Sequence, residues 1–119
     1  RKFAQVEQEL QLAHEIQQRL IPKSYPSCNE LDIYGSCVSA SQVGGDYLDV
    51  FSSESGKYTI FIIADVSGHG FASALVSMQF RSLARMELIK GAEDLGKEIE
   101  QINSVFSNDN QDGSMFITA

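Results

Sequence analysis

Two aspartates stand at places in this sequence where a carboxylate requires a compensating positive charge. Asp65 closes the apolar run 58–64 and leads into the glycine-containing turn 67–70, while Asp46 follows a pair of glycines. A carboxylate at the end of a buried strand is costly to desolvate unless a cation neutralises it. Divalent ions such as Mg²⁺ and Mn²⁺ prefer carboxylate, carbonyl and water oxygens. We therefore expect Asp46 and Asp65 to converge on a metal site, with a backbone carbonyl of the turn within reach of the same ion.

Two further residues near these aspartates could take part in chemistry. Asp49 lies three positions after Asp46, so on an extended strand it faces the other way, which favours a solvated role or one beside a ligand over direct ligation. His69 could be a general acid or a metal ligand, or it could simply be exposed in its tight turn and hydrogen-bonded to its neighbours. The sequence leaves both interpretations of His69 open.

The elements that must position these side chains follow from the apolar periodicity. Residues 2–20 have heptad spacing and end before Pro22, which predicts a helix that either packs on its own domain or forms a short coiled coil. Strands are expected at 31–40, 47–51 and 58–64 and from 114 onward, with helices at 71–90 and 93–106. The turn 52–57 joins two strands without a helix between them, which indicates an antiparallel sheet and an α+β fold.

The composition excludes several classes of function. The chain has 119 residues, of which 43% are hydrophobic and 21% charged, and its net charge of -7 leaves no basic surface for nucleic acid. No run approaches the roughly 20 apolar residues of a membrane span. The two cysteines are too few for a disulfide scaffold, so we expect free thiols and a cytoplasmic location. Both ends have the character of cuts in a longer protein.

Two short motifs suggest other ligands and fit them poorly. The loop 108–113 has the acidic and amide residues that open a calcium-binding EF-hand, but Ala119 stands where the bidentate glutamate should be. We interpret it as a turn. The segment 68–73 follows a strand and opens a helix, as a dinucleotide-binding loop does, but Ser73 replaces the third glycine and such a loop requires a parallel sheet.

Several motifs, in order, resemble the bacterial PPM-type serine/threonine phosphatases, in the branch of stage II sporulation protein E and the RsbU-like stress-response regulators. The segments that carry the resemblance are 15–22 (EIQQRLIP), 43–49 (VGGDYLD), 64–70 (ADVSGHG), 72–75 (ASAL) and 115–118 (MFIT). They span nearly all of this chain and a little over the N-terminal half of the family's domain. Residues 1–22 then correspond to a linker helix, and residues 23–119 to the N-terminal portion of the phosphatase domain.

The resemblance implies a fold, a reaction and a set of partners. The fold would be part of an α-β-β-α sandwich with antiparallel sheets. Asp65 would bridge two Mn²⁺ or Mg²⁺ ions, the carbonyl of Val66 would be a further ligand, and Asp46 would serve the second ion. A metal-activated water would attack the phosphorus of a phosphoserine or phosphothreonine. The substrate would be an anti-sigma-factor antagonist or a similar regulator, and an upstream sensor would act through the N-terminal helix.

The same resemblance places the family's later acidic ligands after Ala119, so residues 1–119 alone should be inactive. Sheet edges left uncovered would favour a homodimer. The alternative function is a non-catalytic module that dimerises or relays a signal through its N-terminal helix.

Overall fold

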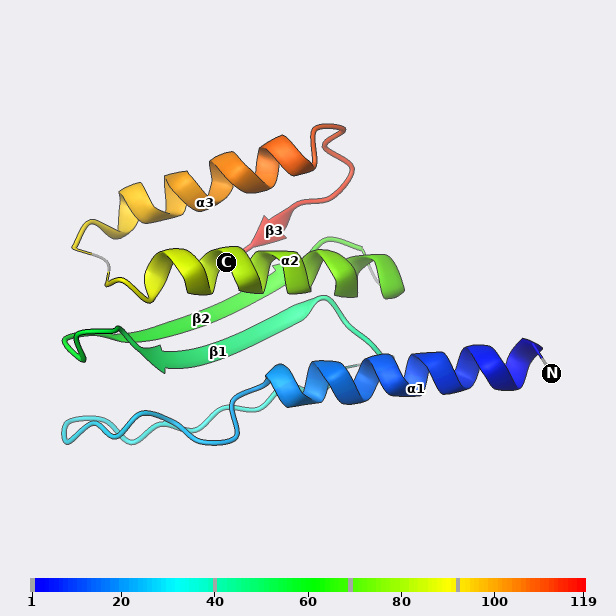
Figure 1. The fold of residues 1–119 in the computed structure, drawn as a ribbon, viewed down its shortest axis with the longest axis horizontal. Helices are drawn as coiled ribbons and strands as arrows, with labels where there is room; N and C mark the ends of the chain where they lie inside the picture. The colour runs from blue at the N-terminus through cyan, green and yellow to red at the C-terminus, as the bar shows by residue number, and fades with distance from the viewer. Residues whose placement is uncertain (1, 40, 69, 92) are drawn as a thin grey trace.

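The computed structural model describes residues 2–39, 41–68, 70–91 and 93–119. Along the chain the elements are helix, two strands, two helices and a short strand (Figure 1). Their bounds are α1 (Lys2–Leu20), β1 (Asp46–Ser52), β2 (Thr59–Val66), α2 (Phe71–Leu88), α3 (Leu95–Asp109) and β3 (Ile117–Thr118). The strands form one antiparallel sheet in the order β1-β2-β3, which confirms the predicted α+β class and the predicted antiparallel hairpin.

The core lies between one face of this sheet and the helices α2 and α3. Alternate residues of β1 and β2 point toward α2, as the two-residue period of a strand requires. The buried cluster comprises Tyr47, Phe51, Ile62, Ala64, Ala84, Leu88 and Ile102. On the opposite face of β2, Phe61 and Ile63 remain 53% and 76% exposed. The described part of the chain therefore covers one face of β2 and leaves the other open.

The predicted turns and helix ends agree closely with the structure. The β1–β2 hairpin closes with a bond from the Ser53 amide to the Tyr58 carbonyl (2.9 Å), and Gly56 takes the positive φ of 74° that its turn requires. Gly91, with φ of 94°, ends α2 through a bond to the Leu88 carbonyl. The helix α3 extends beyond its predicted end to Asp109, so the first residues of the expected loop 107–113 are helical.

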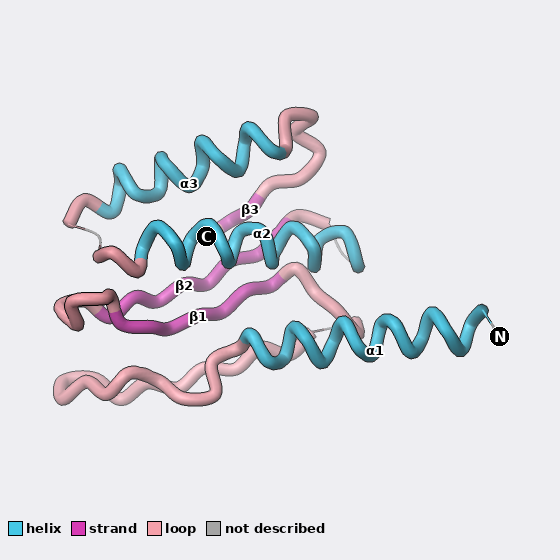
Figure 2. The backbone as a smooth tube through the Cα atoms, in the orientation of Figure 1, coloured by secondary structure: helices cyan, strands magenta, loops and turns pink. Residues whose placement is uncertain are grey.

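The strand predicted at residues 31–40 is wrong for residues 31–39, and residue 40 lies outside the described residues. Residues 21–39 and 41–45 run out and back as a long connection between α1 and β1 (Figure 2). The Tyr25 hydroxyl donates to the Gly35 carbonyl at 2.6 Å, and Gly35 lies against the Leu48 side chain. Alternation specifies which side chains share a face, whereas a strand also needs a partner backbone, which this segment lacks among the described residues.

The N-terminal end of the helix α1 projects beyond the rest of the fold, while its C-terminal end lies beside the body of the molecule (Figure 1). Within the described residues, no Cα atom of α1 comes within 8 Å of a Cα atom in another helix or strand. No described helix is long and apolar enough to cross a membrane. Cys28 and Cys37 are both free, as expected.

Candidate metal centre

The hairpin register places the two predicted aspartates directly opposite one another. Asp46 of β1 pairs with Asp65 of β2. Backbone hydrogen bonds join the pairs at the two ends of this ladder: the Val66 amide donates to the Gly45 carbonyl at 3.3 Å, and the Ser53 amide donates to the Tyr58 carbonyl. Hydrogen-bonded pairs occur at every second position of an antiparallel ladder, and Asp46 lies one position from Gly45. The two aspartates therefore form a non-hydrogen-bonded pair, in which the Cα atoms approach to about 4.5 Å and the side chains lie closer than in the alternate type. The predicted convergence of Asp46 and Asp65 is present in the backbone itself.

The electrostatics of this pair suit a cation. Both side chains are exposed, on the same open face as Ile63. The pKa of Asp46 is raised, first by partial burial and then by the hydrogen bond and negative charge of Asp65. Two carboxylates so close repel one another, and a divalent ion between them would remove the repulsion. Oxygen donors of this type fit Mg²⁺ or Mn²⁺.

The structure also constrains the third predicted ligand. The Val66 side chain is buried, so only its backbone could reach an ion on the open face. Its amide points toward β1, and in an antiparallel ladder the N–H and C=O of one residue point to the same side. The Val66 carbonyl is thus directed toward the segment that carries Asp46. Within the described ranges, no three His, Cys, Asp or Glu side chains gather closely enough to hold a metal ion.

Close packing restricts both glycines before Asp46, and Gly45 more than Gly44. A Cβ atom on Gly45 would lie 3.0 Å from the Ser73 Cβ and 3.2 Å from the Val66 Cβ, tighter than side chains normally allow. A Cβ atom on Gly44 would overlap the Ser39 hydroxyl. Gly45 therefore lets the segment before β1 lie close to Ser73 in the first turn of α2, whereas at Gly44 the contact is with the end of the Ser39 side chain, which can move.

The turn after Asp65 is fixed on both sides. Gly68 and Gly70 have φ of 81° and 83°, which residues with side chains rarely adopt. Ser67 bonds Phe116 twice, once through its amide and once through its hydroxyl, both at 2.8 Å. The Ser73 hydroxyl donates to the Gly70 carbonyl at 2.9 Å. Asp65 is thus held between the start of β3 and the start of α2. His69 lies outside the described residues.

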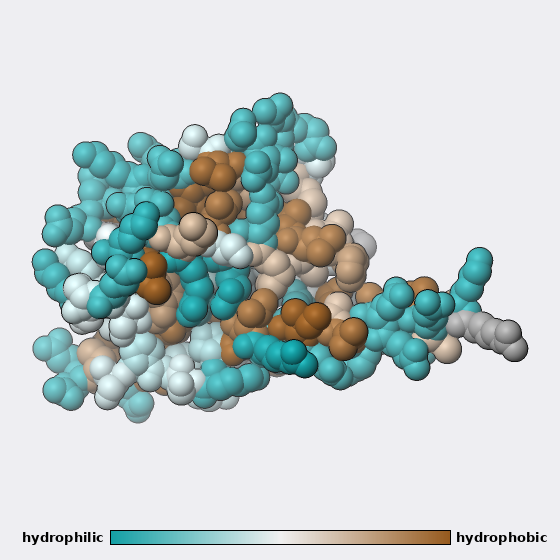
Figure 3. All heavy atoms as spheres, in the orientation of Figure 1, coloured by the Kyte–Doolittle hydropathy of each residue, from teal (hydrophilic) through white to brown (hydrophobic). Residues whose placement is uncertain are grey.

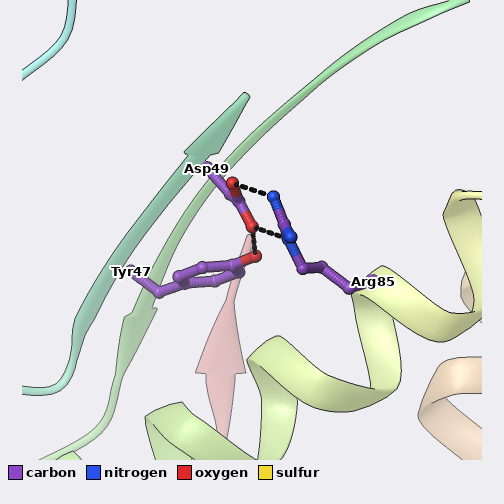
Figure 4. A network of polar contacts seen from close by, with 3 residues as sticks. All are labelled: Tyr47, Asp49 and Arg85. Atoms are coloured by element: carbon purple, nitrogen blue, oxygen red, sulfur yellow. Dashed lines mark hydrogen bonds and ion pairs between the residues drawn. The ribbon is translucent and has the colours of Figure 1, made fainter. Parts of the chain in front are cut away.

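Asp49 differs from the prediction of a solvated carboxylate. Its side chain is 0% exposed, and it accepts bonds from Arg85 Nε (2.6 Å) and Nη2 (3.1 Å) and from the Tyr47 hydroxyl (Figure 4). Burial, and then Asp49, raise the pKa of Tyr47, while the bond to Asp49 raises the pKa of Arg85. Asp49 faces away from Asp46 as expected, but toward α2, where it ties the helix to β1.

Sequence reasoning missed Arg85, although a signal for it was present. An aspartate on the core face of a strand needs a cation, and Arg85 is one of two arginines on the helix that covers that face. The guanidinium also stacks 4.6 Å from the centre of the Phe51 ring.

The competing ligand sites are not supported by the described residues. The antiparallel pairing of β1 with β2 excludes the parallel sheet that a dinucleotide site at 68–73 requires. In the loop that resembles an EF-hand, the Asp112 carboxylate is occupied by the amide and hydroxyl of Ser114, at 3.0 and 2.9 Å. A hollow of about 790 Å³ beside β2 and α3 is lined mainly by apolar side chains and includes neither Asp46 nor Asp65.

Two carboxylates paired across an antiparallel hairpin, next to a glycine turn that opens a helix, define an α+β domain with a candidate site for a hard cation. Residues 55–119 match the family model of stage II sporulation protein E (SpoIIE), and the chain belongs to this family.

Two relatives from Bacillus subtilis (strain 168) align with most of the chain. It is 31% identical to the phosphoserine phosphatase RsbP over 109 residues, which are 87% of this chain and 26% of that protein. It is 33% identical to the phosphoserine phosphatase RsbU over 115 residues, which are 96% of this chain and 33% of that protein. The chain thus spans a third or less of the length of these relatives.

Proposed function

We propose that the protein containing this chain is a metal-dependent phosphatase of phosphoserine or phosphothreonine in proteins, and that Asp46 and Asp65 bind its Mn²⁺ or Mg²⁺ ions. The observation that carries the proposal is the direct pairing of Asp46 with Asp65 across the hairpin. Membership of the SpoIIE family and the names of the two relatives support the reaction class.

In this proposal the chain contributes ligands and their placement. Asp65, which is held between β3 and α2, would hold the ions together with Asp46 and the Val66 carbonyl. When bound, divalent ions generate a nucleophile from water at neutral pH and neutralise charge that develops on the phosphoryl group. Neutralisation of the phosphoryl charge by the ions is essential here, because a chain with a net charge of -7 does not itself attract phosphate.

We further propose that residues 1–119 alone bind metal weakly and do not turn over substrate. Only two carboxylates meet in the described part of the site, whereas a stable Mg²⁺ or Mn²⁺ centre uses more oxygen ligands. By the family resemblance, the substrate is a cytoplasmic phosphoprotein such as an anti-sigma-factor antagonist, and the signal arrives through α1.

The test is dephosphorylation of a phosphoserine peptide by the intact parent protein, with and without Mn²⁺. Asp65→Asn and Asp46→Asn should each reduce kcat/KM by at least about 100-fold, because an amide replaces a charged ligand. Asp32→Asn is the matched control, since Asp32 is an exposed aspartate outside the hairpin. An Asp65→Asn protein as active as the wild type would refute the proposal, and robust turnover by residues 1–119 would refute the claim of an incomplete site.

A second candidate is a non-catalytic module that dimerises or relays a signal, and the exposure of α1 favours it. The helix buries none of its described residues, and its exposed apolar side chains are Phe3, Val6, Leu12 and Ile16. On the face shown in Figure 3, apolar side chains gather where α1 meets the body of the molecule, while the projecting part is mostly hydrophilic. Sedimentation of the intact parent, together with the phosphatase assay above, separates the two candidates. A dimer without Mn²⁺-dependent activity would favour the non-catalytic module.

A further inference from the structure

The helix α1 reaches the rest of the fold through a clamp on the segment before β1. The Gln17 side-chain amide donates to the Gly44 carbonyl at 2.8 Å and accepts from the Gly44 amide at 3.1 Å. One turn earlier, His14 Nδ1 lies 2.5 Å from the Gln42 carbonyl. The Cα atoms of α1 stay more than 8 Å from those of every other described helix and strand, so α1 meets the rest of the fold through side chains, and these bonds link it directly to the segment before Asp46.

The clamp acts on Gly44, two residues before β1 begins. The Gly45 carbonyl accepts from the Val66 amide of β2, whereas both backbone groups of the neighbouring Gly44 bond Gln17 of α1. A glutamine side chain carries one carbonyl and one N–H₂ group, so it can bond both backbone groups as a neighbouring strand would. Gln17 thus satisfies both backbone groups of Gly44, on the approach to β1.

Gly44 is also the residue where such a clamp matters most. It has no side chain to anchor it, and a glycine loses more conformational freedom on ordering than any other residue. Gly45, next along the chain, is held by Val66, and Asp46 follows at once. The clamp therefore completes the fixation of the backbone that presents the Asp46 carboxylate to Asp65.

We propose that Gln17 is a positioning residue for Asp46: its amide holds Gly44, and so makes the arrangement of the carboxylate pair depend on the seating of α1. This inference rests on the proposed function, because its consequence is measured as metal affinity. It assigns a specific contact to the otherwise weakly attached helix. It also accounts for the polar Gln17 at a heptad position of α1, since the other positions are the apolar Phe3, Val6, Leu10, Ala13 and Leu20.

The experiment uses the intact parent protein and two measurements. Amide hydrogen exchange without metal should show the Gly44 amide protected in the wild type and about tenfold less protected in Gln17→Leu, which removes both bonds. Calorimetric titration with Mn²⁺ should show an affinity about tenfold weaker in the same variant. Gln17→Glu keeps the acceptor for the Gly44 amide and loses the donor, so its Gly44 protection and its Mn²⁺ affinity should lie between those of the wild type and those of Gln17→Leu. Gln11→Leu, on the exposed surface of the same helix, is the matched control and should behave as the wild type.

The outcomes separate this inference from the proposed function. If Asp65→Asn abolishes Mn²⁺ binding while Gln17→Leu and Gln17→Glu bind Mn²⁺ like the wild type, the positioning role is wrong and the metal site stands. If Asp65→Asn binds Mn²⁺ as the wild type does, both proposals fail. If Gly44 exchange is unchanged in Gln17→Leu, the clamp does not order this segment and the inference is overturned. If Gln17→Leu does not fold, Gln17→Glu decides by the same two measurements.

Discussion

Replacing Arg85 by methionine leaves the Asp49 carboxylate buried without its cation, and the structure sets the scale of the cost. Breaking a fully buried ion pair from one side costs about 3–5 kcal/mol. The Asp49 side chain is 0% exposed, but that of Arg85 is 35% exposed, so water can approach the carboxylate once the guanidinium is gone. We therefore expect a loss of about 2–3 kcal/mol, a large share of the 5–15 kcal/mol by which a typical domain is stable.

Urea denaturation of the chain, followed by far-ultraviolet circular dichroism, measures this loss. With a denaturant slope of about 2 kcal/mol per molar urea, the midpoint should fall by about 1–1.5 M. Asp49→Asn introduced into the Arg85→Met protein should restore part of the loss, because it removes the stranded charge. Such non-additivity is the signature of a direct pair.

Arg81→Met is the matched control, one helical turn away on α2. The Arg81 Nε is buried and has no hydrogen-bond partner among the described residues, so its removal should change the midpoint by less than about 0.3 M or raise it. Equal losses in Arg81→Met and Arg85→Met would contradict the reasoning. So would an Arg85→Met protein that Asp49→Asn does not rescue, because the cost would then come from helix packing rather than from a buried charge.

Two further predictions concern the residues around the site. The pKa of Tyr47 is raised above its ordinary value of 10.0, because burial and Asp49 favour the protonated phenol in the folded protein. The contribution of the protonated phenol to the free energy of unfolding is therefore complete below pH 10 and declines as the pH rises above 10. Urea midpoints should fall less steeply above pH 10 in Tyr47→Phe than in the wild type, and parallel slopes would contradict this. Gly45→Ala places a Cβ atom 3.0 Å from that of Ser73 and should cost about 1–3 kcal/mol in the same urea assay. Gly96→Ala, inside α3, should instead be neutral or stabilising, and a Gly45→Ala protein that matches it would show that the close approach is not restrictive.

The elements that the sequence predicts well are those whose signals are local. The helices α1, α2 and α3 follow from apolar periodicity, and the ends of α1 and α2 from Pro22 and Gly91. The start of α3, predicted at residue 93, is at Leu95, where Asp94 accepts a bond from the Lys97 amide at 3.3 Å. The hairpin follows from two apolar runs around a turn that contains Gly56. Each of these signals lies within a few residues of the structure it specifies.

The errors concern features that depend on distant partners. The pattern of residues 31–39 alternates like that of a strand, but no sequence rule states whether a partner edge is available. The burial of Asp49 depends on Arg85, 36 residues later, and the clamp on Gly44 depends on Gln17, 27 residues earlier. The partners in such polar pairs lie far apart in the sequence and meet only in the folded chain, so composition and periodicity do not reveal them.

The candidate metal site combines a local signal with a distant contact, because the turn between β1 and β2 determines that Asp46 and Asp65 lie opposite one another. The register pairs Ser52 with Thr59 at the turn and, six steps along, Asp46 with Asp65. A slip of one residue at the turn would place Asp46 opposite Ala64 or Val66 and would put the two carboxylates on opposite faces of the sheet. The conformation of the 53–58 turn, with its positive φ at Gly56, therefore helps to specify a site at the far end of the hairpin. An aspartate pair recognised in the sequence becomes a candidate metal centre only through that register.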